Sequence, residues 1–239
     1  LANLEAAVVE EKKIEEMDVV FLMDRFGYAK TIDVSAYERN KEAADNENRY
    51  IIRCKNTDKI CVFTDKGQLH LIKVLDLPFG KFRDKGKPID NVSNYNSNEE
   101  NFVYIASLNA IREQKVLFGT KMAMLKVVNG SEFDVAKRTT AATKLTDGDE
   151  VLLVHVVAGD ETIVMQSEKD MFLRIEENTV PEKKKGAVGV RGMRLAEGDS
   201  LSHIYLLAAD ASQTIELKGK EVALNRIRVA NRDTKGVKK

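Results

Sequence analysis

The stretch Leu145-Thr-Asp-Gly148-Asp149-Glu-Val151-Leu-Leu-Val154 returns 50 residues later as Leu195-Ala-Glu-Gly198-Asp199-Ser-Leu201-Ser-His-Ile204. Both copies run from a leucine through a Gly-Asp turn into an apolar segment. A strand-rich unit that recurs about every 40–50 residues is typical of the blades of a propeller-like array. Such arrays are usually binding platforms, so we expect function on the surface rather than in a buried active site.

Five apolar runs open the repeats, near residues 19, 60, 116, 163 and 214, and each is followed by a charged turn and a second apolar run. Short runs of Val, Ile, Leu and Phe closed by Gly or Asp turns predict β-hairpins. The sequence therefore predicts an all-β fold of about five, possibly six, four-stranded antiparallel blades. Residues 18–239 would form one such domain, preceded by an acidic lead-in or short helix over residues 1–17. The polar stretch Glu38–Arg49 is expected to be an exposed loop.

A basic residue or histidine follows each charged turn, near the third or fourth position of the second run. These residues are Lys30, His70, Lys126, Arg174 and Arg226. A single lysine on a strand usually faces solvent, but a lysine or arginine in four of the five repeats, with histidine in the fifth, predicts a shared cationic surface.

The net charge of zero hides a strong asymmetry along the chain. Residues 1–18 carry a net charge of −4, whereas residues 180–195 carry +4 and residues 218–239 carry +6. Binding to a polyanion depends on the local field, so the zero total does not exclude such a partner.

Composition points to an intracellular protein. Cys54 and Cys61 have no further Cys or His at metal-ligand spacing. Because Cys61 lies in an apolar run, we expect a buried thiol. Free thiols are typical of a reducing, cytoplasmic compartment, and a disulfide is the alternative. No apolar run approaches the roughly 18–20 residues that span a bilayer, so no membrane association is expected. The start at Leu1 suggests a fragment of a longer protein.

No catalytic, metal or cofactor site is recognisable in the sequence. The three histidines stand apart from one another, and no Ser-His-Asp order or paired catalytic carboxylates can be identified. Gly186, Gly189 and Gly192 lie in a G-x-x-G-x-x-G stretch that matches neither nucleotide-binding glycine motif. This stretch is better suited to a bent loop with outward-facing cations, or to an ordinary mobile loop with scattered charge.

Three stretches resemble a known family. They are Asp18-Val-Val-Phe-Leu-Met-Asp-Arg-Phe-Gly-Tyr-Ala-Lys30, Val62-Phe-Thr-Asp-Lys-Gly67, and Gly186-Ala-Val-Gly-Val-Arg-Gly-Met-Arg-Leu195 with Glu197-Gly-Asp199. Together they resemble the C-terminal β-pinwheel domain of the A subunit of bacterial type IIA topoisomerases, DNA gyrase and topoisomerase IV. The resemblance extends over about residues 18–232.

The resemblance implies a disc of blades whose basic perimeter bends or wraps duplex DNA without reading its sequence. It also implies a bacterial, nucleoid-associated protein. The cleavage core of the parent enzyme and its B subunit, which bring the catalytic tyrosine, ATP and Mg²⁺, would lie outside this chain. The isolated domain is expected to be a monomer without a cofactor.

One departure from the family bears on the subtype. Gyrase A subunits carry a glycine-rich basic box in the first blade, but the corresponding Glu38–Arg49 has no glycine and a net charge of −1. A Leu-Pro element at Leu77-Pro78 follows the second strand pair, as in topoisomerase IV. Both features favour a topoisomerase IV-type protein, with a gyrase that has a degenerate box as the alternative.

The bases of the repeats and of the two basic stretches are the candidate DNA contacts. They are Lys30, Lys73, Lys126, Arg174, Lys183, Lys184, Lys185, Arg191, Arg194, Arg226 and Arg228. The competing interpretation is a protein-interaction platform whose lysines only maintain solubility.

Overall fold

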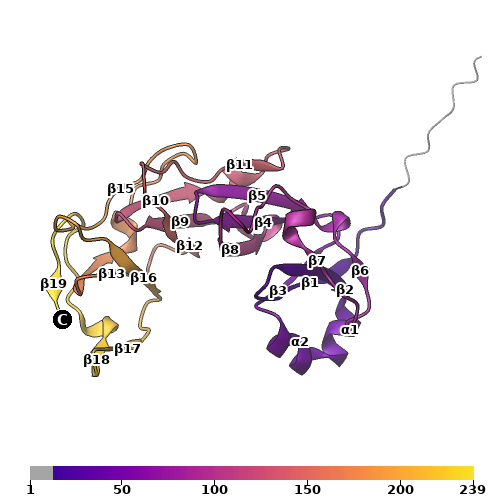
Figure 1. The fold of residues 1–239 in the computed structure, drawn as a ribbon, viewed down its shortest axis with the longest axis horizontal. Helices are drawn as coiled ribbons and strands as arrows, with labels where there is room; N and C mark the ends of the chain where they lie inside the picture. Colours follow the sequence, from indigo (N-terminus) through magenta and orange to yellow (C-terminus); the bar gives the residue numbers. More distant parts are fainter. Residues whose placement is uncertain (1–12) are drawn as a thin grey trace, which may run out of the picture.

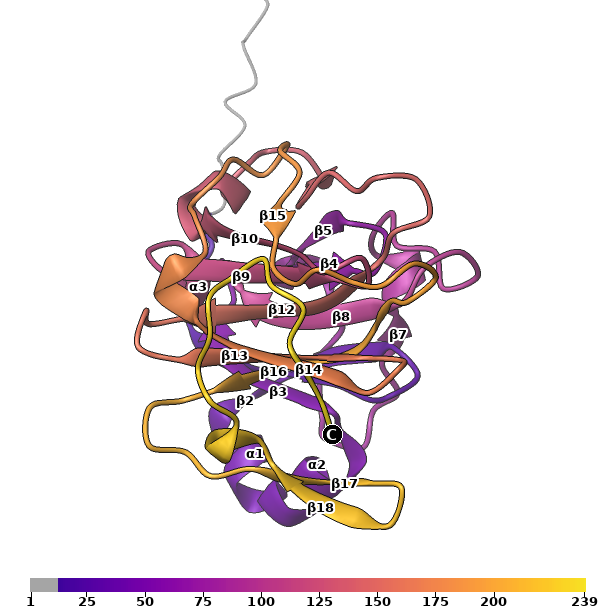
Figure 2. The ribbon, with the colours of Figure 1, turned by 90° about the vertical axis from the view of Figure 1, so that its left-hand side faces the viewer.

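The computed structural model describes residues 13–239 and shows small sheets that follow one another along an open arc (Figure 1). The all-β class is confirmed, and the helices in this range, α1 (Val34–Arg39), α2 (Lys41–Glu47) and α3 (Leu108–Ile111), are short. The predicted acidic lead-in lies mostly outside the described residues, and positions 13–17 adopt neither helix nor strand. Figure 2 turns one end of the arc towards the viewer, with the last hairpin below the sheet of β13 and β16.

Each of the five predicted openings begins a β-hairpin. The hairpins are β1 (Asp18–Met23) with β2 (Tyr28–Asp33), β4 (Lys59–Thr64) with β5 (Gln68–Lys73), β9 (Lys115–Thr120) with β10 (Met124–Asn129), β13 (Thr162–Ser167) with β14 (Met171–Glu176), and β17 (Thr214–Leu217) with β18 (Lys220–Ala223). We call the sheets built on them blades 1 to 5.

A third strand pairs with the first strand of each of the first four hairpins. These inner strands are β3 (Tyr50–Lys55), β8 (Phe102–Ser107), β12 (Val151–Val157) and β16 (Leu201–Leu207). Strand β3 contacts β8, β8 contacts β12, and β12 contacts β16, so the inner strands join neighbouring blades along the arc.

The outer strand of each blade comes from the following repeat. After the second strand of a hairpin, the chain makes a 3₁₀ turn and crosses back to pair with the second strand of the preceding blade. The turns are η1 (Val74–Asp76), η3 (Gly130–Phe133), η4 (Glu177–Thr179) and η5 (Leu224–Arg226), and η2 (Ile89–Asn91) precedes β8. The outer strands are β6 (Phe79–Gly80) with β7 (Lys87–Pro88), β11 (Thr139–Ala141), β15 (Val190–Arg191) and β19 (Val237–Lys238).

We call residues 77–88, 134–141, 180–191 and 227–238 the return segments, because each runs from a 3₁₀ turn to the end of an outer strand. The long strand pairs are all antiparallel, as predicted. Within residues 13–239, parallel pairing is limited to two residues between β2 and β6 and to the single bridges Val127↔Glu182, Arg174↔Val229 and Met193↔Thr234.

The predicted loop at Glu38–Arg49 is largely helical instead. Asp33 caps α1 by accepting a hydrogen bond from the backbone N–H of Ala36, and Ala44 of α2 is buried against blade 1. Helices α1 and α2 occupy the place at which the other hairpins send out a return segment, and blade 1 is the first blade of the arc.

Apolar side chains pack between neighbouring blades rather than at one central hub. Between blades 2 and 3, the ring of Phe63 lies 5.1 Å from that of Phe133 and 5.8 Å from that of Phe118, both edge to face. Edge-to-face aromatic pairs add about 0.5–1.5 kcal/mol to the stabilisation by burial. Each blade is therefore stabilised by packing against the next.

Both cysteines are buried free thiols, as the apolar surroundings of Cys61 predicted. Burial raises the pKa of Cys54 to about 12 and also raises the pKa of Cys61. Neither thiol is therefore a reactive thiolate near neutral pH.

No helix within residues 13–239 is long and apolar enough to cross a membrane.

Three return segments bring a glycine against the backbone of the strand that they cover. A Cβ atom on Gly86 would lie 2.6 Å from the carbonyl oxygen of Ala29, and one on Gly189 would lie 2.6 Å from that of Leu125. Gly236 approaches Phe172 in the same way. Of the spaced glycines noted in the sequence, Gly189 thus allows an outer strand to pack closely on its blade, whereas a Cβ on Gly186 would meet no atom within 4 Å.

We predict that Gly189→Ala destabilises the protein by about 1–3 kcal/mol, because the new methyl group must push the return segment away from β10. Gly186→Ala is the matched control in the same loop, since a Cβ there meets no atom within 4 Å. Denaturant unfolding measures both. Equal stability of the two variants would contradict this account of the glycine.

Candidate nucleic-acid interface

The return segments form the outer rim of the arc. In each of blades 1 to 4 the strand order runs from the inner strand through the hairpin to the outer strand. Strands β6, β7, β11, β15 and β19 accordingly lie along the convex side in Figure 1. One basic loop per blade is thereby presented on a continuous curved edge.

Positive charge is concentrated on these segments. Their 44 residues hold 14 of the 38 lysines and arginines but only 4 of the 38 acids. The return segments therefore carry a net charge of +10, and the rest of the chain carries −10. Most of the bases are exposed, namely Lys81, Arg83, Lys85, Lys87, Lys137, Arg138, Lys184, Arg191, Arg228, Lys235 and Lys238.

The recurring base of the repeats does not contribute to this surface. Lys30, His70 and Lys126 occupy equivalent positions on the second strands, opposite Leu22, Val62 and Phe118. Arg174, opposite Val164, lies one position further along its strand, at the place of Val127 in blade 3. All four side chains lie beneath the return segment of their own blade and bind it. The predicted shared cationic surface at this position is therefore wrong, because a segment from much later in the chain covers it.

Lys126 is the most deeply enclosed of the four, with 1% of its surface exposed. Its ammonium group donates to the carbonyl oxygens of Lys184 at 2.8 Å, Lys185 at 3.1 Å and Ala187 at 2.8 Å. Burial lowers the pKa of Lys126 to about 8. The cation is thus held by a ring of backbone acceptors.

Arg174 and Lys30 make the same kind of contact in blades 4 and 1. The guanidinium of Arg174 donates to the carbonyl oxygens of Asn225 at 2.7 Å and Ile227 at 3.1 Å. The ammonium of Lys30 donates to the carbonyl oxygens of Phe82 and Asp84. Burial lowers the pKa of Lys30 as well.

Blade 2 uses a histidine at this position. One ring nitrogen of His70 lies 2.9 Å from the hydroxyl of Thr139, and the other lies 3.1 Å from both carboxylate oxygens of Glu100. His70 and Glu100 are both buried. Arg226, the predicted fifth member, lies in η5 after β18 and is exposed rather than placed on the strand.

The remaining predicted contacts lie on or beside the rim. Lys73 is exposed at the end of β5, and Lys183 and Lys185 are half-buried on either side of exposed Lys184. The ammonium of Lys185 donates to the hydroxyl of Thr140 at 3.1 Å, which links the return segments of blades 3 and 2. Arg226 and Arg228 are both exposed.

Two recesses in the rim are lined by bases. Lys59, Lys73, Lys87, Lys137 and Arg138 line a groove of about 440 Å³ where the return segments of blades 1 and 2 approach each other. A second groove of about 860 Å³ on blade 4 is lined by bases without an acid, including Arg226, Arg228, Lys235 and Lys239.

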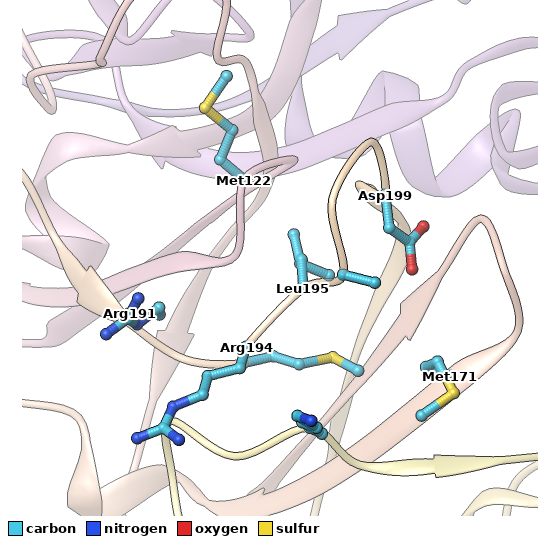
Figure 3. Close-up of a pocket in the computed structure, with 9 residues that line it drawn as sticks. Met122, Met171, Arg191, Arg194, Leu195 and Asp199 are labelled. Atoms are coloured by element: carbon cyan, nitrogen blue, oxygen red, sulfur yellow. The ribbon is translucent and has the colours of Figure 1, made fainter.

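A third recess, of about 510 Å³, is mainly apolar (Figure 3). Met122 and Met171 lie on opposite sides of it, with Arg191 and Arg194 along one edge. Both arginines pair with Asp233, whose carboxylate oxygen lies 2.6 Å from Nε of Arg191 and 3.4 Å from Nε of Arg194. Asp233 thus ties the return segments of blades 3 and 4 together while offsetting part of their charge.

The basic stretch of the first return segment was not among the contacts predicted from the sequence. Lys81, Arg83, Lys85 and Lys87 place four bases within seven residues, opposed by Asp84 alone. A similar charge density identified residues 180–195 in the sequence. The stretch at residues 81–87 follows the hairpin of blade 2 along the chain, but it lies on blade 1.

Comparison with known proteins agrees with this geometry. Residues 114–158 and 161–208 match the model of the DNA gyrase C-terminal domain, a β-propeller. The DNA gyrase A subunit of Lawsonia intracellularis is 27% identical over 99% of this chain, and that of Escherichia coli K12 is 29% identical over 98%. The chain spans 30% and 28% of the length of these two curated relatives.

The solved structures that this chain resembles include C-terminal domains of DNA topoisomerase IV and of DNA gyrase. That of DNA topoisomerase IV has a TM-score of 0.81 at 22% identity and covers 94% of this chain and 73% of its own. The E. coli ParC domain has a TM-score of 0.76 at 15% identity, covering 93% and 94%. The DNA gyrase A domain has a TM-score of 0.59 at 17% identity, covering 92% and 76%. The resemblance drawn from the sequence is confirmed.

The depressed pKa of Lys126 predicts a specific pH dependence of stability. Between about pH 8 and 10.5 the unfolded chain holds this proton and the folded chain releases it, so rising pH stabilises the fold by up to about 3 kcal/mol. Lys126→Met lacks this titration. The free energy of unfolding of the wild type, minus that of the variant, should rise across this window. Parallel pH profiles would contradict a depressed pKa.

Proposed function

We propose that this chain, a C-terminal β-pinwheel domain of the kind found in type IIA topoisomerase A subunits, binds and bends duplex DNA along its outer rim. The observation that carries the proposal is the net charge of +10 on four return segments that follow one another along a convex edge. Lysines and arginines that contact phosphates release condensed counterions, and this release supplies sequence-independent affinity.

The form of the rim favours backbone contacts over base readout. Its bases stand on short loops and two- or three-residue strands, whereas the major groove is usually read by a helix or a two-stranded ribbon. Helices α1 and α2, which pack against Phe82 of the first return segment, have only 6 and 7 residues. Binding is therefore expected to be indifferent to sequence.

The proposed contacts follow from exposure. Among the residues predicted from the sequence, Lys73, Lys183, Lys184, Lys185, Arg191, Arg194, Arg226 and Arg228 remain candidates. Lys81, Arg83, Lys85, Lys87, Lys137 and Arg138 join them. Lys30, Lys126 and Arg174 act from beneath the rim rather than at the phosphates.

We place the domain with topoisomerase IV rather than gyrase in its behaviour. The helical pair α1–α2 stands where the family's glycine-rich basic box is expected, and its acids outnumber its bases. The larger TM-scores against the topoisomerase IV and ParC domains support this assignment. The similarity in sequence to the gyrase A subunits supports the alternative, a gyrase domain with a degenerate box.

In a full-length protein, the domain would present bent duplex to a cleavage core that works with a B subunit, ATP and Mg²⁺. Smoothly bending 20–30 base pairs by tens of degrees costs about 1–6 kcal/mol, which the rim contacts must offset.

We predict that changing Lys183, Lys184 and Lys185 together to alanine weakens binding about equally on unrelated duplexes. With about six phosphate contacts, log affinity against log salt should slope at about −5 in the wild type, and the triple variant should lose up to about three units of slope. Gel shifts at several salt concentrations measure this.

The control for that experiment changes Lys41, Lys55 and Lys66 to alanine, which removes the same charge from exposed, ion-paired lysines off the return segments. The control should bind like the wild type. Equal losses in both variants would attribute binding to total charge. Failure of the wild type to retain DNA near physiological salt would favour a protein-interaction platform.

We further predict little constrained supercoiling. Blade 1 lacks a basic box, and the charge of the return segments is weakest at blade 2, where two bases oppose one acid. Binding the domain to nicked circular DNA, ligating and removing the protein should leave the linking number nearly unchanged. A large positive shift would assign gyrase-like wrapping.

A further inference from the structure

Lys126 is buried beneath the rim, at a place where a hydrocarbon side chain would suit the surroundings better. Lys126 is surrounded by its blade and opposes Phe118, whose ring centre lies 5.8 Å from the ammonium nitrogen. Removing a charge from water costs several kcal/mol unless it is compensated by hydrogen bonds. Here the compensation comes from the backbone carbonyl groups of the return segment.

The return segments have few other backbone attachments to their blades. Strand β15 pairs with β10 only through Val190 and Arg191, and β19 pairs with β14 only through Val237 and Lys238. Between residues 183 and 190, Lys126 supplies three hydrogen bonds at the middle of the loop. The backbone N–H of Lys144 also donates to the carbonyl oxygen of Ala187, and that of Lys185 donates to the carboxylate of Glu132, so Lys126 makes the largest set of hydrogen bonds from one residue to this loop.

The carbonyl groups that these bases hold lie on, or close in sequence to, the residues that carry the rim charge. The carbonyl oxygen of Lys184 faces Lys126 while the Lys184 side chain is exposed. Arg174 holds the carbonyl of Ile227, directly before exposed Arg228, and Lys30 holds that of Phe82, directly before exposed Arg83. Each interior base thus fixes the backbone beside a basic side chain of the rim.

The pattern across blades agrees with this. Blades 1, 3 and 4 combine an interior lysine or arginine with a return segment holding four bases. Blade 2 has His70 in the equivalent place, bound to side chains, and its return segment holds only Lys137 and Arg138 as bases.

We propose that Lys30, Lys126 and Arg174 are positioning residues of the DNA track, each holding the backbone of its return segment so that the bases there face the duplex. This inference rests on the proposed DNA binding. The three residues contact carbonyl groups of the protein and not phosphates.

The test compares Lys126→Met and Lys126→Arg in the full chain. Methionine keeps an unbranched apolar side chain without donors, and arginine keeps the charge and the donors. Lys41→Met, on α2, is the control for loss of one charge. Amide hydrogen exchange of residues 183–187 without DNA measures how firmly the loop is held. The salt dependence of binding to a duplex of about 100 base pairs measures how many phosphate contacts the rim makes.

We expect Lys126→Met to fold, to exchange these amides at least about tenfold faster, and to lose about one to two units of salt slope, because the bases of the loop no longer align with phosphates. Lys126→Arg should restore the slope, and Lys41→Met should leave it unchanged. If Lys126→Met does not fold, the same two measurements are made on Arg174→Met, with amide exchange followed at residues 225–230.

Faster amide exchange with unchanged affinity and salt slope would show that Lys126 holds the loop without positioning its bases for DNA, and would overturn the inference. Unchanged exchange would overturn it as well. A wild-type chain that binds the duplex without a salt slope would instead refute the proposed function, so the two failures are distinguishable.

Discussion

The structure depends on the pairing of each outer strand with the hairpin of the preceding blade. Because β11 and β15 arise only after the hairpins of the following blades, blades 2 and 3 are completed by chain that has already started the next blade. The exchange covers sheet edges that would otherwise expose unpaired backbone groups. Within residues 13–239, the β17–β18 hairpin receives no such strand and remains two-stranded. Non-local pairing of this kind is slow to form but makes the blades mutually dependent.

The same exchange creates the candidate binding surface. A return segment must be long enough to cross from one blade to another and pairs with its blade over only a few residues, so the rest of it is free to carry charge. The polar interior contacts of Lys126 and Arg174 and the close approach of Gly86, Gly189 and Gly236 then fix it against the blade. A chain with no net charge thereby presents one cationic edge, while acids predominate elsewhere.

Much of the fold could be predicted from the sequence, because apolar periodicity and Gly-Asp turns act locally. The five openings and the basic stretch at residues 183–194 were visible in this way. The fate of Lys126 was not, because the carbonyl groups that enclose it lie 58 to 61 residues later and an isolated lysine on a strand normally faces water. The helices at residues 34–47 were missed because their polar residues resemble a loop, although Ala36 and Ala44 sit on a buried face.

The central claim is that DNA follows the outer rim, and lysine reactivity tests it most directly. The protein is treated with an amine-acylating reagent with and without a duplex of about 100 base pairs, and modification is located by mass spectrometry. The account predicts protection of Lys81, Lys85, Lys137, Lys184 and Lys235, with unchanged reactivity at Lys41 on α2 and Lys66 in the β4–β5 turn. Protection of Lys41 and Lys66 with unprotected rim lysines would contradict it.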